Sequence, residues 1–513
     1  MGDGDKASSV ADFYKNANVF LTGGTGFVGM ALIEKLLRCT EVSHIYMLIR
    51  AKKDKSPTQR LQDLAKDPLY EKLTEERGAD IFSKVVGVSG NVEDEGLGLS
   101  PEDRQMLKDN VHIVIHSAAT LDFEAPLKPT VVTNLQGTRR VLELAKEIPH
   151  LKALVHVSSA YVNSNLRDVD EILYPVKEDP DKLIDLCNTL TVEALDALTP
   201  KLLGDLPNAY VLTKALAEHE VSKVADRIPA AIVRPSMITS AWKEPIPGWT
   251  NSKNGPTGFM MGASKGVVRR LPVKSDLIYD YIPVDMVVNE ILVAAWHVAS
   301  KRSPAVSVFH CTSSTCNPFR WSSIENHLNT YLHKYPLKSA VWYPYVKFVP
   351  SLLMFRISAI FVHFIPAYIL DTVMRLTGGR PILVRLHTNV NRSLGKLAPF
   401  IFNEWHFDNK NTQSLNKQLS EEDRKMFSFD ISTLDWPIYF VNLSQGVRCY
   451  LNKEHPRTLP AALRKDKILL VLHVVTQALI FSLIWWLVAV CLGTTMTRSS
   501  WVPLVSYFLF SLL

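Results

Sequence analysis

A glycine-rich turn between a buried strand and an amphipathic helix is the feature that most constrains this fold. Residues 18–21 (NVFL) form a short apolar run that leads directly into TGGTGFVG, and MALIEKLLR follows with helical spacing. Gly23 permits a tight turn, Gly26 lets the backbone approach a pyrophosphate, and Gly29 lets the helix pack closely on the strand. The helix N-terminus then offers N–H groups and a positive dipole to the phosphates. The turn therefore predicts a dinucleotide-binding fold.

Further apolar runs indicate the rest of the sheet. They lie at residues 44–49, 111–115, 153–157 and 231–233, and helical patterns separate them. Continuous apolar strands that alternate with helices are typical of a parallel sheet covered on both faces. We therefore predict an α/β fold with a doubly wound parallel sheet of the Rossmann type over residues 1–290.

The end of the second strand indicates which dinucleotide is bound. An NAD-binding protein usually has Asp or Glu at this point, where it holds the ribose 2′-hydroxyl. This chain instead has Arg50, followed by Lys52 and Lys53. A cationic cluster suits a 2′-phosphate, so the sequence favours NADPH, although an ordinary solvated basic loop would look the same.

Two Tyr-x-x-x-Lys pairs occur in the sequence, and one of them is placed for catalysis. Tyr210 and Lys214 (YVLTK) open a predicted helix, whereas Tyr343 and Lys347 enclose a proline and lie beyond the dinucleotide domain. One helical turn puts Tyr210 and Lys214 on the same face. We expect the lysine ammonium to lower the pKa of the phenol toward the range of a general acid.

A serine pair completes the predicted catalytic group. Ser158 and Ser159 follow the strand at 153–157, about 50 residues before Tyr210. A hydroxyl there would hydrogen-bond a substrate carbonyl oxygen as negative charge develops on it. We assign this role to Ser159 in preference to Ser158.

Composition argues against several other classes of protein. The 513 residues carry 57 Lys or Arg and 51 Asp or Glu, a net charge of +6, without a basic block dense enough for nucleic acid. Of six cysteines only Cys311 and Cys316 lie close together, at a spacing that fits no zinc motif. We therefore expect no nucleic-acid partner, no metal site, and reduced cysteines in a protein that faces the cytosol.

The C-terminal region contains the longest apolar segment. Residues 468–492 carry no formally charged side chain and are long enough to cross a bilayer as a helix, which takes roughly 20 residues. Arg464, Lys465 and Lys467 precede this segment, and only Arg498 follows it. The positive-inside bias therefore places the large N-terminal part in the cytosol.

Two other apolar tracts are less suited to crossing a membrane. Residues 501–513 are too short for a separate span, and we expect them to lie in the interface or to fold back. Residues 351–371 are interrupted by Arg356, His363 and Pro366, which favours an interfacial or buried helix over a span.

Longer stretches resemble a known family. TGGTGFVG, the arginine that ends the second strand, HSAAT, VSSAY and YVLTK are similar to motifs of extended short-chain dehydrogenase/reductases (SDRs). IVRPSMITSAWKEPIPGW, NGPTGFMMGASKG, YIPVDMVVN, CTSSTCNPFRW and LDWPIYFVNLSQGVRCYL resemble the animal, insect-like fatty acyl-CoA reductases. The resemblance covers nearly the whole chain. That family often has threonine where this chain has Ser159, and the hydroxyl is retained.

The resemblance implies a reaction. Long-chain fatty acyl-CoA would be reduced to fatty alcohol by two NADPH-dependent hydride transfers through a bound aldehyde, with release of CoA and without an acyl-cysteine intermediate. Ser159, Tyr210 and Lys214 would be catalytic. Three alternatives remain open: a thioester reductase that stops at the aldehyde, a sterol-type SDR dehydrogenase, and a non-catalytic NADPH-binding membrane scaffold.

The resemblance also implies the cofactor contacts. They come from the glycine turn, the end of the second strand, HSAAT and the catalytic lysine: Thr22, Gly23, Thr25, Gly26, Phe27, Gly29, Arg50, Lys52, Ser117, Ala118 and Lys214.

The expected domains follow from these motifs. They are an NADPH-binding reductase domain (1–290), a connecting region that completes the substrate site (291–360), a mostly helical C-terminal domain (361–453), a transmembrane helix (468–492) and a short apolar tail (501–513). We expect the apolar region after about residue 350 to shelter the acyl chain. The expected partners are long-chain acyl-CoA and the lipid bilayer, and the family suggests the peroxisomal or endoplasmic reticulum membrane.

Overall fold

The chain forms two compact units, each assembled from separate stretches of sequence. The computed structural model describes residues 9–52 and 55–512, with side chains up to Phe508. Unit 1 comprises the described residues up to Asn251, Ile278–Phe319 and Trp405–Tyr439. Unit 2 comprises Ser252–Leu277, Arg320–Glu404 and the described residues from Phe440 onward.

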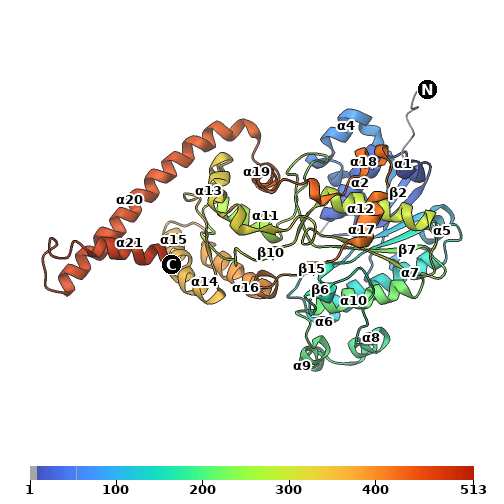
Figure 1. Cartoon of the computed structure of the whole chain (residues 1–513), viewed down its shortest axis with the longest axis horizontal. Helices are drawn as coiled ribbons and strands as arrows, with labels where there is room; N and C mark the ends of the chain where they lie inside the picture. The colour runs from blue at the N-terminus through green and yellow to red at the C-terminus, as the bar shows by residue number, and fades with distance from the viewer. Residues whose placement is uncertain (1–8, 53–54, 513) are drawn as a thin grey trace. The chain divides into compact units, whose positions relative to one another are not determined.

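Unit 1 is built on a seven-stranded, wholly parallel sheet with the order β3-β2-β1-β4-β5-β7-β12 (Figure 1). The strands are β1 (Asn18–Thr22), β2 (His44–Ile49), β3 (Val85–Ser89), β4 (Ile113–His116), β5 (Ala153–Val157), β7 (Ala230–Pro235) and β12 (Ser307–Cys311). The order reverses between β1 and β4, so the glycine turn after β1 opens at the topological switch point. The predicted doubly wound fold is confirmed.

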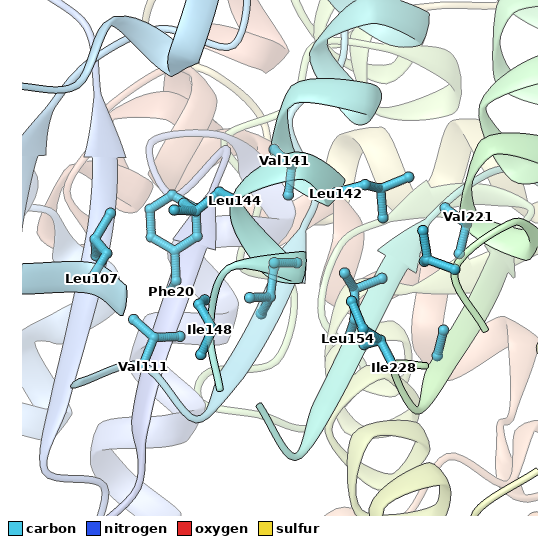
Figure 2. Close-up of a cluster of buried hydrophobic side chains, with 14 of the residues drawn as sticks. Phe20, Leu107, Val111, Val141, Leu142, Leu144, Ile148, Leu154, Val221 and Ile228 are labelled. Atoms are coloured by element: carbon cyan, nitrogen blue, oxygen red, sulfur yellow. The ribbon is translucent and has the colours of Figure 1, made fainter. Parts of the chain in front are cut away.

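Helices cover both faces of this sheet. On one face Phe20 and Leu154 of the strands pack against Leu107, Val141 and Val221, in a buried apolar cluster (Figure 2). Those three residues belong to α5 (Pro101–Asn110), α7 (Gly137–Lys146) and α10 (Ala209–Ser222). The other face is covered by α2 (Phe27–Cys39) and α12 (Val284–Ser300), which contact each other. Burial of the strands on both sides explains their continuous apolar sequences.

Shorter elements complete unit 1. Its further helices include α1 (Ser9–Tyr14), α3 (Pro57–Leu64), α4 (Glu71–Arg77), α6 (Leu127–Thr130), α8 (Pro180–Thr189) and α9 (Val192–Leu203). A parallel pair, β8 (Met237–Thr239) with β11 (Tyr281–Pro283), continues beyond β7.

Residues 405–439 return to unit 1 and close it. β15 (His406–Phe407) pairs with β6 (Asp168–Val169), and α17 (Lys410–Lys417) and α18 (Glu421–Phe427) follow. The buried Glu171 carboxylate accepts hydrogen bonds from the His310 N–H (2.8 Å), the Thr412 N–H (3.1 Å) and the Thr412 hydroxyl (2.8 Å). A buried carboxylate needs such partners, so Glu171 binds this returning segment to the end of the sheet.

Unit 2 is mostly helical. Its main helices are α11 (Gly255–Ser264), α13 (Glu325–Lys334), α14 (Leu352–Ala359), α15 (Ile365–Leu376), α16 (Leu383–Ile401), α20 (Leu459–Cys491) and α21 (Val502–Leu512). α19 (Trp436–Gly446) leads from unit 1 into unit 2. By length and composition, the described helices include two that could cross a membrane, Leu352–Leu376 and Pro456–Cys491. The second contains almost all of the span predicted at 468–492 and starts ahead of it.

Candidate active site

The glycine turn between β1 and α2 has the shape that a bound pyrophosphate requires. Gly23 has φ +75°, and a Cβ there would lie 2.8 Å from the backbone of Ser117 and Ala118. A Cβ on Gly29 would lie 2.2 Å from the Gly23 carbonyl oxygen. The N-cap residue Gly26 makes no side-chain cap hydrogen bond, which leaves the N-terminus of α2 to bind an anion. The residues present therefore fit a dinucleotide phosphate.

Hydrogen bonds around Thr22 join the ends of β1 and β4. Thr22 Oγ1 lies 2.7 Å from His116 Nδ1 and accepts the N–H of Ala118 at 3.2 Å. The Ser117 hydroxyl donates to the Thr22 carbonyl oxygen at 2.8 Å. These contacts hold TGGTGFVG beside HSAAT. Thr22 is fully buried and its hydroxyl serves this junction, whereas Ser117 and Ala118 lie against the turn itself.

Two arginines lie beside the end of β2. Arg50 is half exposed, and its guanidinium lies 3.4 Å from Glu93 Oε1. Arg60, on α3, donates to the Arg50 carbonyl oxygen at 2.6 Å and to Thr25 Oγ1 at 3.1 Å. Sequence reasoning missed Arg60, which links the predicted cofactor residues Thr25 and Arg50. The sequence feature that could have indicated Arg60 is its positive charge on α3, the helix that directly follows the basic residues after β2.

The other predicted cofactor residues of this region lie apart from those arginines. Lys52 is exposed, and its backbone pairs with that of Lys55. Lys53 lies outside the described residues. The Phe27 ring, at the start of α2, is 5.3 Å from the ring of the buried Trp249.

Ser159 and Tyr210 come together beyond the carboxyl end of β5. The Asn208 side chain caps α10 by accepting the N–H of Val211 at 3.0 Å, which sets Tyr210 in the first turn of the helix. The phenol of Tyr210 is buried, and the Ser159 side chain lies close enough to lower the pKa of the phenol. Ser159 Oγ also accepts the N–H of Tyr161 at 3.3 Å. The predicted pair is thus in contact.

Lys214 lies one turn further along α10. Its ammonium is buried and donates to the Val157 carbonyl oxygen at 2.7 Å. The rings of His116 and His156 pack 5.3 Å apart near it. Burial, followed by the charge of Lys214, lowers the pKa of His116 to about 3 and that of His156 well below its usual value. Lys214 is therefore surrounded by neutral imidazoles.

The pKa values differ from the expectation that lysine activates the phenol. Burial raises the pKa of Tyr210 to about 12; the hydrogen bond from Ser159 opposes this rise, and the negative charge of Glu218 adds to it. Burial lowers the pKa of Lys214 to about 8, with Glu218 opposing the change. Desolvation thus outweighs the opposing effect of Ser159, and Tyr210 is protonated at neutral pH.

Asn134 connects two segments that carry predicted site residues. Its side-chain oxygen accepts the N–H of Thr120 at 2.9 Å, and its amide donates to Thr213 Oγ1 at 3.2 Å. The loop after β4 is thereby tied to α10. The ring of Phe123, in the same loop, lies 5.3 Å from that of Tyr210.

The second Tyr-x-x-x-Lys pair is placed differently. Tyr343 belongs to unit 2, where its ring stacks on that of His333 at 4.6 Å, and Lys347 begins the short strand β14 (Lys347–Val349). The pair does not lie on one helix, which agrees with the choice of Tyr210 and Lys214 as the catalytic pair.

Comparison with known proteins now decides the family. A protein-family model for an NAD-binding domain, described as male sterility protein, matches residues 21–291. A second family model with the same description matches residues 362–454. The Drosophila melanogaster protein CG8306, whose name describes it provisionally as a fatty acyl-CoA reductase, is 54% identical to this chain. The match covers 99% of this chain and 100% of CG8306. This chain belongs to the fatty acyl-CoA reductase family.

The reductase has further relatives of similar length. It is 36% identical to fatty acyl-CoA reductase 1 of Rattus norvegicus over 88% of each chain. It is 35% identical to fatty acyl-CoA reductase wat of Drosophila melanogaster, over 95% of this chain and 94% of that one.

Solved structures share the fold of this reductase. The reductase domain of a nonribosomal peptide synthetase from Mycobacterium tuberculosis has a TM-score of 0.54 and 17% identity, over 86% of this chain and 95% of that one. The terminal R domain from the myxalamid biosynthetic pathway has a TM-score of 0.53 and 19% identity, over 86% and 90%.

Proposed function

We propose that this reductase converts long-chain fatty acyl-CoA to fatty alcohol in two NADPH-dependent reductions, through a bound aldehyde and with release of CoA. The observation that carries the proposal is the contact between Tyr210 and Ser159, one helical turn from Lys214, at the same edge of the sheet as the glycine turn. The names of the relatives supply the substrate class.

Tyr210 is suited to give a proton to the substrate oxygen. Bound NADPH supplies the hydride, and a carbonyl that accepts hydride develops negative charge on oxygen. With a pKa of about 12 the Tyr210 phenol stays protonated at neutral pH, yet an alkoxide is a far stronger base and takes its proton. The hydroxyl is therefore a general acid that does not ionise before the reaction.

Ser159 and Lys214 position and polarise the reacting groups. Ser159 Oγ accepts the N–H of Tyr161, so its own hydrogen remains available for donation to a substrate oxygen beside Tyr210. The Val157 carbonyl oxygen holds the Lys214 ammonium in place. Lys214 would bind the nicotinamide ribose hydroxyls and add positive charge beside the developing oxyanion.

Two guanidinium groups support NADPH as the reductant. Arg50 takes the place where an acidic residue would hold the ribose of NAD, and Arg60 contacts both the Arg50 backbone and Thr25 of the glycine turn. Planar guanidinium groups bind phosphate through paired hydrogen bonds, which suits a 2′-phosphate.

We further propose that α20 anchors the reductase in the peroxisomal or endoplasmic reticulum membrane, with the catalytic residues in the cytosol. Polar contacts hold the first turns of α20 to residues 333–338 of the same unit. Asp466 lies 3.0 Å from His333 Nδ1, and Lys465 Nζ donates to the Lys338 carbonyl oxygen at 2.8 Å. The apolar stretch that follows is mostly exposed, as a lipid-facing helix would be. Alkaline extraction of membranes and organelle imaging of the full chain would check this; release into the soluble fraction contradicts it.

The reaction is tested with detergent-solubilised protein, labelled acyl-CoAs of several chain lengths, and either NADPH or NADH. Alcohol and aldehyde are resolved as products. We expect alcohol with NADPH, and a loss of about 10²- to 10⁴-fold in Tyr210→Phe because a general acid is removed. Tyr343→Phe, in the other Tyr-x-x-x-Lys pair, is the matched control and keeps full activity.

Other products would change the assignment. Aldehyde alone indicates a one-step thioester reductase. NADPH binding without turnover of any acyl-CoA indicates another substrate or a non-catalytic role. Full activity of Tyr210→Phe contradicts the role given to the phenol.

A further inference from the structure

A helical hairpin in unit 2 has an inverted distribution of polarity. The hairpin consists of a first arm, formed by α14, a π-helical turn (Ile360–Phe364) and α15, and a second arm, α16. The exposed face of the first arm is apolar and includes Leu353, Ile357, Ile360, Phe361, Ile365 and Ile369. Leu353 is 69% exposed and Ile369 is 59% exposed. The spacing of these residues repeats every three to four positions, so they form a continuous stripe along the arm.

Three polar side chains of the first arm lie on its buried face, whereas Arg356, Thr372 and Arg375 are exposed beside the apolar stripe. Ser358, His363 and Asp371 are each no more than 5% exposed, and they share that face with Phe355 and Val362. A helix of a water-soluble domain places its polar side chains outward and its apolar ones inward. The reverse arrangement is the one found in helices that contact lipid, whose polar residues face the protein.

Hydrogen bonds fix this orientation. His363 Nε2 accepts the N–H of Arg269 at 3.0 Å and the N–H of Arg270 at 3.2 Å. The Asp371 carboxylate accepts the first N–H groups of α16, from residues 382–384, at 2.9–3.1 Å. The His363 and His387 rings stack at 4.8 Å across the two arms. Rotation of the first arm would break all of these contacts, so its apolar face stays outward.

The second arm excludes a transmembrane hairpin. The outer face of α16 carries Arg385, Thr388 and Lys396, and Arg380 lies in the turn between the arms; all are exposed. A hairpin that crossed the bilayer would bring these side chains into hydrocarbon, which is unfavourable for each basic residue. At the surface of an anionic membrane the same groups would bind headgroups favourably.

We infer that the apolar stripe of the first arm lies in the plane of a phospholipid membrane, with Arg380, Arg385 and Lys396 at the anionic headgroups. Unit 2 also contains α20, whose first turns are fixed to it by the Asp466–His333 and Lys465–Lys338 contacts, so the unit is held at the bilayer. The inference rests on the membrane attachment proposed for α20 and not on the reaction. It resolves the sequence-based choice between an interfacial and a buried helix in favour of the interface.

The test is photocrosslinking of the full-length chain in vesicles. p-Benzoylphenylalanine is placed at Ile357 or Ile369, in vesicles of phosphatidylcholine and phosphatidylserine with labelled acyl chains. Leu483, on the exposed part of α20, reports the anchor, and the exposed polar Asn326 of α13 is the matched control. We expect lipid adducts at Ile357 and Ile369 several-fold above those at Asn326.

The outcomes separate the hairpin from the anchor. Adducts at Leu483 without adducts at Ile357 and Ile369 overturn the inference, as does a crosslink from either position to a second copy of the chain. Adducts at Ile369 without any at Leu483 support the hairpin and contradict the anchor; none at any position overturns both. R380Q/R385Q should reduce the adducts at Ile369 in phosphatidylserine-containing vesicles, and unchanged adducts overturn the role given to the headgroups.

Discussion

Replacement of Gly29 by alanine tests whether the glycine turn depends on close approach of α2 to the backbone. The new Cβ would lie 2.2 Å from the Gly23 carbonyl oxygen and 2.6 Å from Gly24 Cα, where ordinary contact begins at 3.4 Å. The helix start must therefore move by about 1 Å, and overpacking of this kind costs about 1–3 kcal/mol. The higher helix propensity of alanine stabilises the folded protein by about 1 kcal/mol and partly offsets this cost. The expected net change in stability is a modest loss.

The same displacement should reduce the affinity for NADPH more than it reduces the free energy of unfolding. A hydrogen bond from the α2 N-terminus to a charged phosphate contributes about 1.5–3 kcal/mol. Loss of one such bond raises the Kd for NADPH roughly ten- to a hundredfold. We would titrate NADPH fluorescence with the detergent-solubilised full-length protein and record its melting temperature under the same conditions.

Gly395→Ala is the matched control for this experiment. Gly395 also lies inside a helix, α16, but the nearest atom to its Cβ would be Arg356 Nη2 at 3.9 Å. It should gain the same helix propensity without a clash, and keep the original Kd. If Gly29→Ala binds NADPH as tightly as the unchanged protein and melts at the same temperature, the argument from close approach is wrong.

Three other substitutions test the electrostatics of unit 1. Arg60→Ala should raise the KM for NADPH roughly tenfold or more and the KM for NADH less. The proposed charge-assisted hydrogen bond to the 2′-phosphate is lost only with NADPH, whereas the contacts with Thr25 and the Arg50 backbone are lost with both cofactors; equal effects in steady-state kinetics with the two cofactors contradict this. Because the pKa of Lys214 is lowered from 10.5 to about 8, kcat/KM should fall above about pH 8, and Lys214→Arg should move that limb upward in the pH profile. The unfolded lysine keeps its proton to higher pH than the folded one. The free energy of unfolding should therefore increase as the pH rises from about 8 to 10.5, because the cost of holding a buried charge disappears. Arg234→Met should cost about 3–5 kcal/mol in chemical denaturation, because it leaves Glu218, 2.7 Å away and fully buried, without its partner; Lys223→Met on the surface should cost far less.

The central strands of the sheet could be predicted because they are apolar on both faces. All five strands predicted from the sequence are present, as β1, β2, β4, β5 and β7. β3 (VVGVS) was missed because it is an edge strand that contains Gly87 and has partly exposed residues. β12 (SVFHC) was missed because it is the other edge strand and its short apolar core is flanked by Ser307 and His310. The His310 side chain is buried only because Arg234 Nη1 lies 3.1 Å away and the Asp408 carbonyl oxygen 2.6 Å away.

The candidate site was predictable wherever local spacing determines it. Tyr210 and Lys214 are four residues apart on one helix, and Ser159 follows a strand, so sequence alone indicates that they can meet. Arg60 could not be found in this way, because its contact with Thr25 depends on how α3 turns back after β2. The raised pKa of Tyr210 could not be predicted either, since it results from burial that only the tertiary structure shows.

The return of residues 405–439 has a consequence for how this protein is made. Glu171 can form its hydrogen bonds with Thr412 only after that residue has been synthesised. Thr412 follows 241 residues later, which takes on the order of 10–50 s to translate. Until then the Glu171 carboxylate lacks the hydrogen bonds from Thr412. α20 begins only 20 residues after Tyr439 (459 − 439), which takes about 1–4 s to translate. Closure of unit 1 and synthesis of α20, the helix proposed above as the anchor, therefore begin within the same few seconds.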